Sequence, residues 1–186
     1  LRDGESVLDL GSGSGTDTFL AALKVGPKGK VIGVDMTDEQ RAKAERLRDK
    51  AAFNNVSYQK GYFDNLSCGG ESVDVVISNG VINLSPDKAA VFREAARVLR
   101  PGGRLAICDI VTESQLPDTV SGDADLWAAC IGGAVQEDDY RATIEAAGLE
   151  VARVEPCPYE FTSDNAKAAT EKWGVKSIAV LAVKPG

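Results

Sequence analysis

The sequence predicts a single α/β domain built on a doubly wound, mainly parallel sheet of seven strands, with an antiparallel edge strand and helices on both faces. Two observations support this prediction. Short apolar runs alternate with amphipathic segments along most of the chain, and a glycine-rich turn joins the first run to the first amphipathic segment. Repeated strand–helix units give parallel strands joined by right-handed crossovers. The length, without a repeat or a linker, is typical of one domain covering residues 1–186.

The first half of the chain supplies four predicted strands. They are expected at residues 5–10, 29–35, 55–63 and 72–78, where apolar and β-branched residues gather. A helix is predicted from Thr16 to Lys24. A charged amphipathic helix follows and reaches about Lys50, with Thr37 and Asp38 as candidate caps.

A third helix is predicted over residues 85–99, with Ser85 as its N-cap and Pro86 at its first helical position. Pro101 and the two glycines after it end this helix. The rest of the chain is expected to form a strand, a long connection with helical pieces, a helix, a strand, a short helix and a final strand, at residues 104–111, 112–133, 137–148, 149–161, 165–174 and 176–185. Only a short helical stretch separates the last two strands. We therefore expect these two strands to pair antiparallel at one edge of the sheet.

The composition argues against several classes of function. The net charge is −7, which does not favour binding to nucleic acid or to an anionic membrane. The sequence contains no apolar run of membrane-spanning length and no signal-peptide pattern, so we expect a cytoplasmic protein. The chain has no histidine, which excludes histidine-based catalytic triads and imidazole metal ligands, and no metal site is predicted.

Four cysteines are scattered along the chain without the spacing of a zinc site: Cys68, Cys108, Cys130 and Cys157. Most of them are expected to be small buried residues in a reducing cytosol. For Cys108, which lies inside the apolar run "GRLAICDIV", we expect a buried structural thiol.

The segment "VLDLGSGSGTD" places Gly11, Gly13 and Gly15 between a predicted strand and a predicted helix. Such a turn is typical of a Rossmann-like sheet, in which the backbone approaches a ligand outside the carboxyl ends of the strands. The next strand ends in Asp35, whose carboxylate can accept hydrogen bonds from both hydroxyls of a ribose. A tight turn without a ligand would explain the glycines alone. The glycines and Asp35 together predict an adenine-nucleoside ligand.

The glycine spacing and the nearby charges argue against a dinucleotide. The fingerprint G-x-G-x-x-G requires a third glycine where this chain has Thr16 or Thr18. Asp9 and Asp17 flank the loop and would repel a pyrophosphate, whereas they would favour a cationic ligand. S-adenosylmethionine carries an amino group and a sulfonium and has no phosphate, so the charges favour it over NAD.

The combination of "VLDLGSGSG", "VIGVD", "VDVVISN" and "RVLRPGGRL" resembles the class I S-adenosylmethionine-dependent methyltransferases over nearly the whole chain. The resemblance implies S-adenosylmethionine as cofactor, S-adenosylhomocysteine as product and a small-molecule methyl acceptor. The residues that it assigns to the cofactor site are Asp9, Gly11, Ser12, Gly13, Gly15, Asp17, Asp35, Met36, Phe63, Asp64, Asn79 and Gly80.

Within this site, the resemblance gives individual residues different roles. The glycines would surround the methionine part of the cofactor, and Asp9 or a loop amide would lie near its amino group. Met36 would pack on the adenine, or it is an ordinary boundary residue at the sheet edge. Phe63 would flank the adenine, or it belongs to the core. Ser78 and Asn79 would line the path along which the methyl group passes.

A closer resemblance is to the arsenite methyltransferases, carried by "GSGSGTDTFLAALKVGPKGKVIGVDMT", "VISNGVINLSPDK" and "CIGGAVQEDDY". In that family cysteine thiolates hold the arsenic, which suits a soft, thiophilic centre. Cys130 matches one of these cysteines, although it can equally be a buried structural thiol. At a second cysteine position this chain has Gly80, and a third would lie upstream of Leu1. An N-terminal helix or lid is therefore expected to be absent from residues 1–186.

Three hypotheses for the function follow. The chain is an arsenite methyltransferase, a methyltransferase of an organic small molecule, or a non-catalytic module that binds S-adenosylmethionine. Methyl transfer needs mainly proximity and alignment, so no catalytic residue is assigned. Asp109 or Asp123 would be the candidate base for a hydroxyl acceptor. The oligomeric state is not predicted.

Overall fold

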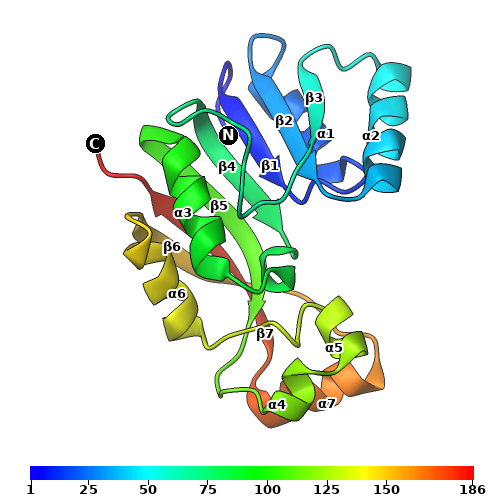
Figure 1. Cartoon of the computed structure of the whole chain (residues 1–186), viewed down its shortest axis with the longest axis vertical. Coiled ribbons are helices and arrows are strands. Elements are labelled where there is room, and N and C mark those ends of the chain that lie inside the picture. The colour runs from blue at the N-terminus through cyan, green and yellow to red at the C-terminus, as the bar shows by residue number, and fades with distance from the viewer.

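The computed structural model describes residues 1–186 and shows one sheet of seven strands in the order β3-β2-β1-β4-β5-β7-β6 (Figure 1). The strands are β1 (Ser6–Leu10), β2 (Lys30–Asp35), β3 (Val56–Lys60), β4 (Val73–Asn79), β5 (Leu99–Val111), β6 (Glu150–Cys157) and β7 (Lys176–Val183). β1 pairs in parallel with β2 and with β4, β2 pairs in parallel with β3, and β4 pairs in parallel with β5. β7 runs antiparallel to both β5 and β6. The predicted mainly parallel sheet with an antiparallel pair at one edge is confirmed, and β7 is the inner member of that pair.

Helices cover the two faces of the sheet as the repeated strand–helix units predict (Figure 1). The helical elements are α1 (Thr16–Val25), α2 (Asp38–Ala51), the 3-10 turn η1 (Ile82–Leu84), α3 (Lys88–Val98), α4 (Asp118–Ser121), α5 (Ala124–Ala128), α6 (Glu137–Ala146) and α7 (Asp164–Trp173). α1 packs on β1 and β2, and α2 packs at the β2–β3 edge. α3 and α6 pack against each other and against β5 and β6. No helix is both long and apolar enough to span a bilayer.

The predicted boundaries of α3 and β3 are wrong for local reasons. The N-cap of α3 is Asp87, whose Oδ1 accepts from the N–H of Ala90 at 2.8 Å, because Ser85 belongs to the turn that follows η1. The N-cap of α2 is Thr37, as predicted, although its hydroxyl makes no capping bond. β3 ends at Lys60, so the next few residues form a loop at the carboxyl edge of the sheet. There the chain is free to line a cavity.

The largest apolar core lies between the sheet and helices α3 and α6, where 22 buried residues form one cluster. Phe92 and Tyr140 meet at its centre, with ring centroids 5.3 Å apart and planes nearly perpendicular. A second cluster of 10 buried residues lies beyond the carboxyl edge of the sheet, among α4, α5 and α7. These three helices gather at one end of the molecule (Figure 1), and the segment that contains Cys130 belongs to this second cluster.

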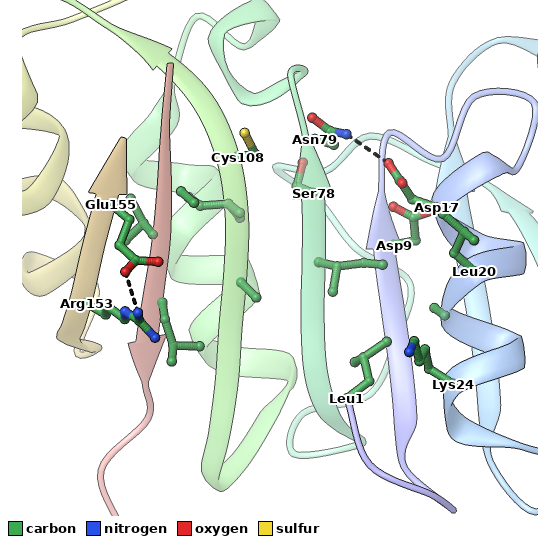
Figure 2. Close-up of a pocket in the computed structure, with 17 residues that line it drawn as sticks. Leu1, Asp9, Asp17, Leu20, Lys24, Ser78, Asn79, Cys108, Arg153 and Glu155 are labelled. Atoms are coloured by element: carbon green, nitrogen blue, oxygen red, sulfur yellow. Dashed lines mark hydrogen bonds and ion pairs between the residues drawn. The ribbon is translucent and has the colours of Figure 1, made fainter. Parts of the chain in front are cut away.

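One face of β4, β5 and β7 is not covered by a helix of this chain, and its side chains line a cavity of about 480 Å³ (Figure 2). The face is lined by the half-buried side chains of Ile77, Ala106, Cys108, Ala179 and Leu181. The prediction of a buried thiol at Cys108 is therefore wrong, because its strand is covered on the opposite face only. A parallel sheet is normally covered on both faces, so this apolar surface is a distinctive feature of the domain.

Replacing Phe92 by alanine is expected to destabilise the fold by about 3–5 kcal/mol, because it leaves a cavity at the centre of the main core. The free energy of unfolding in urea measures the effect. Leu23 lies on α1 and is 67% exposed, so Leu23→Ala should change stability by less than about 0.5 kcal/mol. Equal losses in the two variants would contradict this assignment of the core.

Candidate functional site

The glycine loop between β1 and α1 is shaped by its packing against β3. Gly11, Gly13 and Gly15 all have positive φ angles, of 70°, 51° and 94°. A Cβ at Gly15 would lie 2.2 Å from the hydroxyl oxygen of Tyr58, so only glycine fits between the loop and this strand. A Cβ at Gly13 would have no atom within 4 Å, so the middle of the loop is open on its outer side.

The carboxylate of Asp35 ties the end of β2 to this loop. Its Oδ2 accepts from the N–H of Gly13 and its Oδ1 accepts from the N–H of Thr37, both at 2.8 Å. A carboxylate has about four acceptor positions. Each oxygen of Asp35 therefore keeps a position for a further donor, such as a ribose hydroxyl.

A cavity of about 400 Å³ opens beside Asp35, within the range of volumes found for small-molecule sites. Its lining residues are Gly11, Asp35, Met36, Thr37, Tyr62, Phe63, Asp64, Val81, Leu84, Ser85 and Pro86. Met36 and Tyr62 are 50% and 61% exposed and give the cavity an apolar rim. Phe63 packs against the main core and also lines the cavity, so both of its expected roles are compatible with its position.

The structure thus brings five of the predicted cofactor residues together around one cavity: Gly11, Asp35, Met36, Phe63 and Asp64. Tyr62 lies among them and was not predicted. The expected strand ran through residue 63 and placed Tyr62 inside the sheet. The segment "GYFD" could have identified Tyr62 as a lining residue, because its aromatic side chains follow the end of a strand.

Asp9 is a buried carboxyl group beneath the glycine loop. Asp9 is only 2% exposed, and its Oδ2 accepts a hydrogen bond from the hydroxyl of Thr18 at 2.6 Å. Burial raises the pKa of Asp9, the nearby Asp17 and Asp35 add to this shift, and the Thr18 hydrogen bond opposes it, so that the resulting pKa is about 7. A cation placed near Asp9 would favour its ionised form.

Asp9, Asp17, Ser78 and Asn79 do not line the cavity beside Asp35. They line the other cavity, on the uncovered face of the sheet, where the amide of Asn79 donates to Asp17 at 3.1 Å (Figure 2). The hydroxyl of Ser78 donates to the carbonyl of Leu10 at 3.0 Å and so joins β4 to β1. The predicted residues therefore form two groups, one on each side of the glycine loop.

Gly80 and Cys130 lie next to each other although they are 50 residues apart in the sequence. The thiol of Cys130 donates to the carbonyl oxygen of Gly80 at 2.7 Å. Gly80 has a φ of 67°, and a Cβ built there would have no atom within 4 Å. A side chain at position 80 would therefore meet free space.

Burial and the charge of Asp109 together raise the pKa of the Cys130 thiol to about 11. Lys88 opposes this shift through its positive charge. Burial in turn lowers the pKa of Lys88, while Asp109 and Cys130 raise it. Lys88 was not predicted as a site residue, because "SPDK" reads as an ordinary helix start.

A buried hydrogen-bond network lies beneath Gly80 and Cys130. The amide of Asn83 donates to Oδ1 of Asp109 at 3.0 Å and to the carbonyl of Ile110 at 2.6 Å. The hydroxyl of Tyr140 donates to Oδ2 of Asp109 at 3.1 Å. Both oxygens of Asp109 are thus engaged, and Asp123, the other candidate base, caps α5 through the N–H of Leu126. The geometry favours structural roles for these two carboxylates.

Comparison with known protein families shows to which family the chain belongs. A family model described as a methyltransferase domain matches residues 1–148. The chain belongs to this methyltransferase-domain family. The predicted methyltransferase family and its Rossmann-like fold are thereby confirmed.

Among known proteins, the methyltransferase domain is similar to several named arsenite methyltransferases. It is 49% identical over 166 residues to that of Halobacterium salinarum, covering 88% of this chain and 42% of the relative. It is 45% identical over 168 residues to that of Homo sapiens, covering 86% of this chain and 43% of the relative. The chain therefore spans about half the length of the curated relatives that it matches.

Solved structures agree with this relationship. The arsenic(III) S-adenosylmethionine methyltransferase of Chlamydomonas reinhardtii superposes with a TM-score of 0.81 at 33% identity. The match covers 99% of this chain and 64% of that chain. A sarcosine dimethylglycine methyltransferase from Galdieria sulphuraria, described as putative, gives the same TM-score at 22% identity and shows the shared fold alone.

The buried Asp9 makes the stability of this methyltransferase domain dependent on pH. Its pKa is raised from 3.8 to about 7 in the folded protein, so the folded state binds the proton more tightly than the unfolded chain. Stability is therefore lost as the pH rises from about 4 through about 7. Asp9→Asn removes this loss, and its advantage over wild type should grow by about 1–3 kcal/mol between pH 5 and pH 8. Urea unfolding at the two pH values measures the difference, and a constant difference would contradict the assignment.

Proposed function

We propose that residues 1–186 form the catalytic, S-adenosylmethionine-binding domain of a small-molecule methyltransferase related to the arsenite methyltransferases. One observation carries the proposal. The cavity beside Asp35 is lined in part by Val81, and the adjacent Gly80 carbonyl accepts from the Cys130 thiol at 2.7 Å. A cavity suited to a nucleoside and a sulfur atom thus meet at the end of β4. The names of the most similar relatives support the same class of reaction.

The cavity beside Asp35 fits the adenosine part of the cofactor. Asp35 has free acceptor positions for the ribose hydroxyls, and Asp64 provides a carboxylate at the cavity wall. Met36 and Tyr62 are exposed apolar groups at the rim, and Phe63 lies between them and the core. An adenine ring bound here would bury apolar surface that is exposed in the domain alone.

The glycine loop fits the methionine part of the cofactor. The hydroxyl of Ser12 is buried and has no hydrogen-bond partner, although buried polar groups are normally paired. Above Gly13 the space is open. Asp9 and Asp17 lie close to the loop and favour a ligand with positive charge. A pyrophosphate would be repelled by the same two carboxylates.

When bound, the cofactor supplies a methyl group that its sulfonium has already activated for in-line transfer. The residues of this chain then have to bind and orient the cofactor and the acceptor, and to exclude water. Cys130 is positioned to hold a thiophilic acceptor, but burial keeps its thiol protonated at neutral pH. Binding of the acceptor must therefore displace the thiol proton, and the charge of Lys88 assists this step. No general base is required for an acceptor with its own lone pair.

Gly80 favours a second candidate acceptor, an organic small molecule. Tight binding of arsenic depends on chelation by several thiolates, and position 80 provides none. The open space beside Gly80 would accommodate a bulkier acceptor. A relative with 38% identity over 111 residues is named as the ubiquinone/menaquinone biosynthesis C-methyltransferase of Pasteurella multocida.

Asp35→Ala should weaken the binding of S-adenosylmethionine at least tenfold, by about 1.4 kcal/mol or more, because the ribose and the loop both lose an acceptor. Isothermal titration calorimetry measures the affinity. Asp38 is an exposed carboxylate paired with Lys60 outside the cavity, so Asp38→Ala is the matched control with unchanged affinity. Equal affinities in both variants would remove Asp35 from the site. Micromolar binding of NADH, without binding of S-adenosylmethionine, would overturn the proposed function.

Gly80→Cys is expected to increase the release of S-adenosylhomocysteine with arsenite and a thiol by tenfold or more, because it adds a thiolate beside Cys130. The assay compares arsenite with a panel of organic acceptors. Gly80→Ala is the matched control, since it carries the same backbone strain at a φ of 67° without a thiol. Wild-type turnover of arsenite equal to that of Gly80→Cys would show that one thiolate is sufficient. No turnover with any acceptor, despite cofactor binding, would favour the non-catalytic module.

A further inference from the structure

The connection between β3 and β4 forms one wall of the cavity beside Asp35 and contains no helix. It covers residues 61–72, and the strand order β3-β2-β1-β4 makes it cross two strands (Figure 1). Parallel strands are usually joined by a crossover that includes a helix, whose own hydrogen bonds fix its shape. Here Tyr62, Phe63 and Asp64 line the cavity from an irregular segment. The connection therefore depends on other elements to hold these side chains in place.

The wall turn, residues 62–65, places Phe63 and Asp64 at its tip. The N–H of Asn65 donates to the carbonyl of Tyr62 at 3.2 Å and closes the turn. The next residue, Leu66, is 6% exposed and packs in the main core. The position of the wall turn relative to the core is thus set at Leu66.

Two charged side chains of α3 hold both polar groups of the Leu66 backbone. Oε2 of Glu94 accepts from the N–H of Leu66 at 2.8 Å. Nη2 of Arg97 donates to the carbonyl of Leu66 at 3.1 Å, and its Nη1 donates to the carbonyl of Cys68 at 2.9 Å. The wall turn is therefore fastened to α3 directly after its last residue.

Arg97 and Glu94 also form a bidentate pair, so each fixes the other. Nε of Arg97 donates to Oε1 of Glu94 at 2.6 Å, and Nη2 donates to Oε2 at 2.8 Å. The hydrogen bond from Arg97 lowers the pKa of Glu94, which keeps the carboxylate ionised at neutral pH. An isolated exposed ion pair contributes little to stability. Here, however, one planar guanidinium joins a carboxylate and two carbonyls, an arrangement that the ammonium of a lysine cannot reproduce.

We propose that Arg97 and Glu94 are positioning residues for the cofactor. Neither side chain lines the cavity beside Asp35. They act through the wall turn, which they hold at the place where its side chains can contact an adenine ring. This inference rests on the proposed function, which assigns the cavity to the adenosine part of S-adenosylmethionine. Loss of the pair leaves every side chain of the wall present but no longer fixes its position.

Arg97→Ala should weaken the binding of S-adenosylmethionine about fivefold or more, because the wall turn loses charge-assisted contacts to its backbone. Isothermal titration calorimetry measures the affinity. Arg100 offers a matched control, since its Nη1 donates to Asp74 at 2.6 Å and its Nη2 donates to the carbonyl of Ser72 at 3.0 Å. It fastens the other end of the same connection, outside the cavity, so Arg100→Ala should leave the affinity unchanged.

A second background separates positioning from a general loss of stability. In a protein that carries Tyr62→Ala and Asp64→Ala, Arg97→Ala should weaken binding by less than about twofold, because fewer side chains remain to be positioned. Hydrogen exchange adds a measurement that needs no ligand. The amides of Asn65 and Leu66 should exchange faster in Arg97→Ala than in wild type, and at the wild-type rate in Arg100→Ala. If Arg97→Ala does not fold, Arg97→Lys carries the same expectations.

Wild-type affinity in Arg97→Ala would overturn the proposal. An equal loss in Arg100→Ala, or a loss that persists undiminished without the wall side chains, would overturn it as well. The Asp35→Ala variant distinguishes this failure from that of the proposed function. If wild type binds the cofactor and Asp35→Ala weakens binding whereas Arg97→Ala does not, the positioning role alone is wrong. If wild type does not bind S-adenosylmethionine, the proposed function is wrong and the positioning role falls with it.

Discussion

The parallel register of β2, β1, β4 and β5 is the constraint on which the rest of the structure depends. Backbone hydrogen bonds align Leu10 with Val34 and with Ser78, and Asn79 with Cys108. Because all these strands run in the same direction, their carboxyl ends meet at one edge of the sheet. The glycine loop, the carboxylate of Asp35 and the Gly80 turn are close in space for this reason alone. A shift of one residue in any of the pairings would turn these groups to the wrong face.

Buried carboxyl groups at this edge have different partners and therefore different uses. Asp9 accepts one hydroxyl hydrogen bond and has two other acids nearby, so burial raises its pKa to about 7. Asp109 accepts from Asn83 and Tyr140 and lies near Lys88, which compensates for much of the cost of burial. The first is poised to respond to a cation, whereas the second fixes the turn that carries Gly80.

The two faces of the sheet give the domain two chemically distinct surfaces. On one face, α3 and α6 bury the larger core and leave the cavity beside Asp35 at the edge. On the other face, α1 covers only part of the sheet, and β4, β5 and β7 present apolar side chains and a thiol to the second cavity. Neighbouring residues on one strand, such as Cys108 and Asp109, therefore belong to different environments. The alternation of side chains along a strand makes this separation possible.

The sequence by itself determined the strand–helix order, the glycine loop and the carboxylate at the end of β2, because these features depend on local periodicity and on backbone conformation. It also pointed to Phe63 and Asp64, which line the cavity beside Asp35. It missed the true N-cap at Asp87, since Ser85 and Asp87 both satisfy the local rule and only the turn at η1 selects between them. Tertiary structure alone decided that Cys130 lies on the Gly80 carbonyl, that Asn83 and Tyr140 meet at Asp109, and that Cys108 and Cys157 share a face. All of these contacts join residues that are far apart in the sequence. The shared face of Cys108 and Cys157 depends on the insertion of β7 between β5 and β6, and no local segment encodes that strand order.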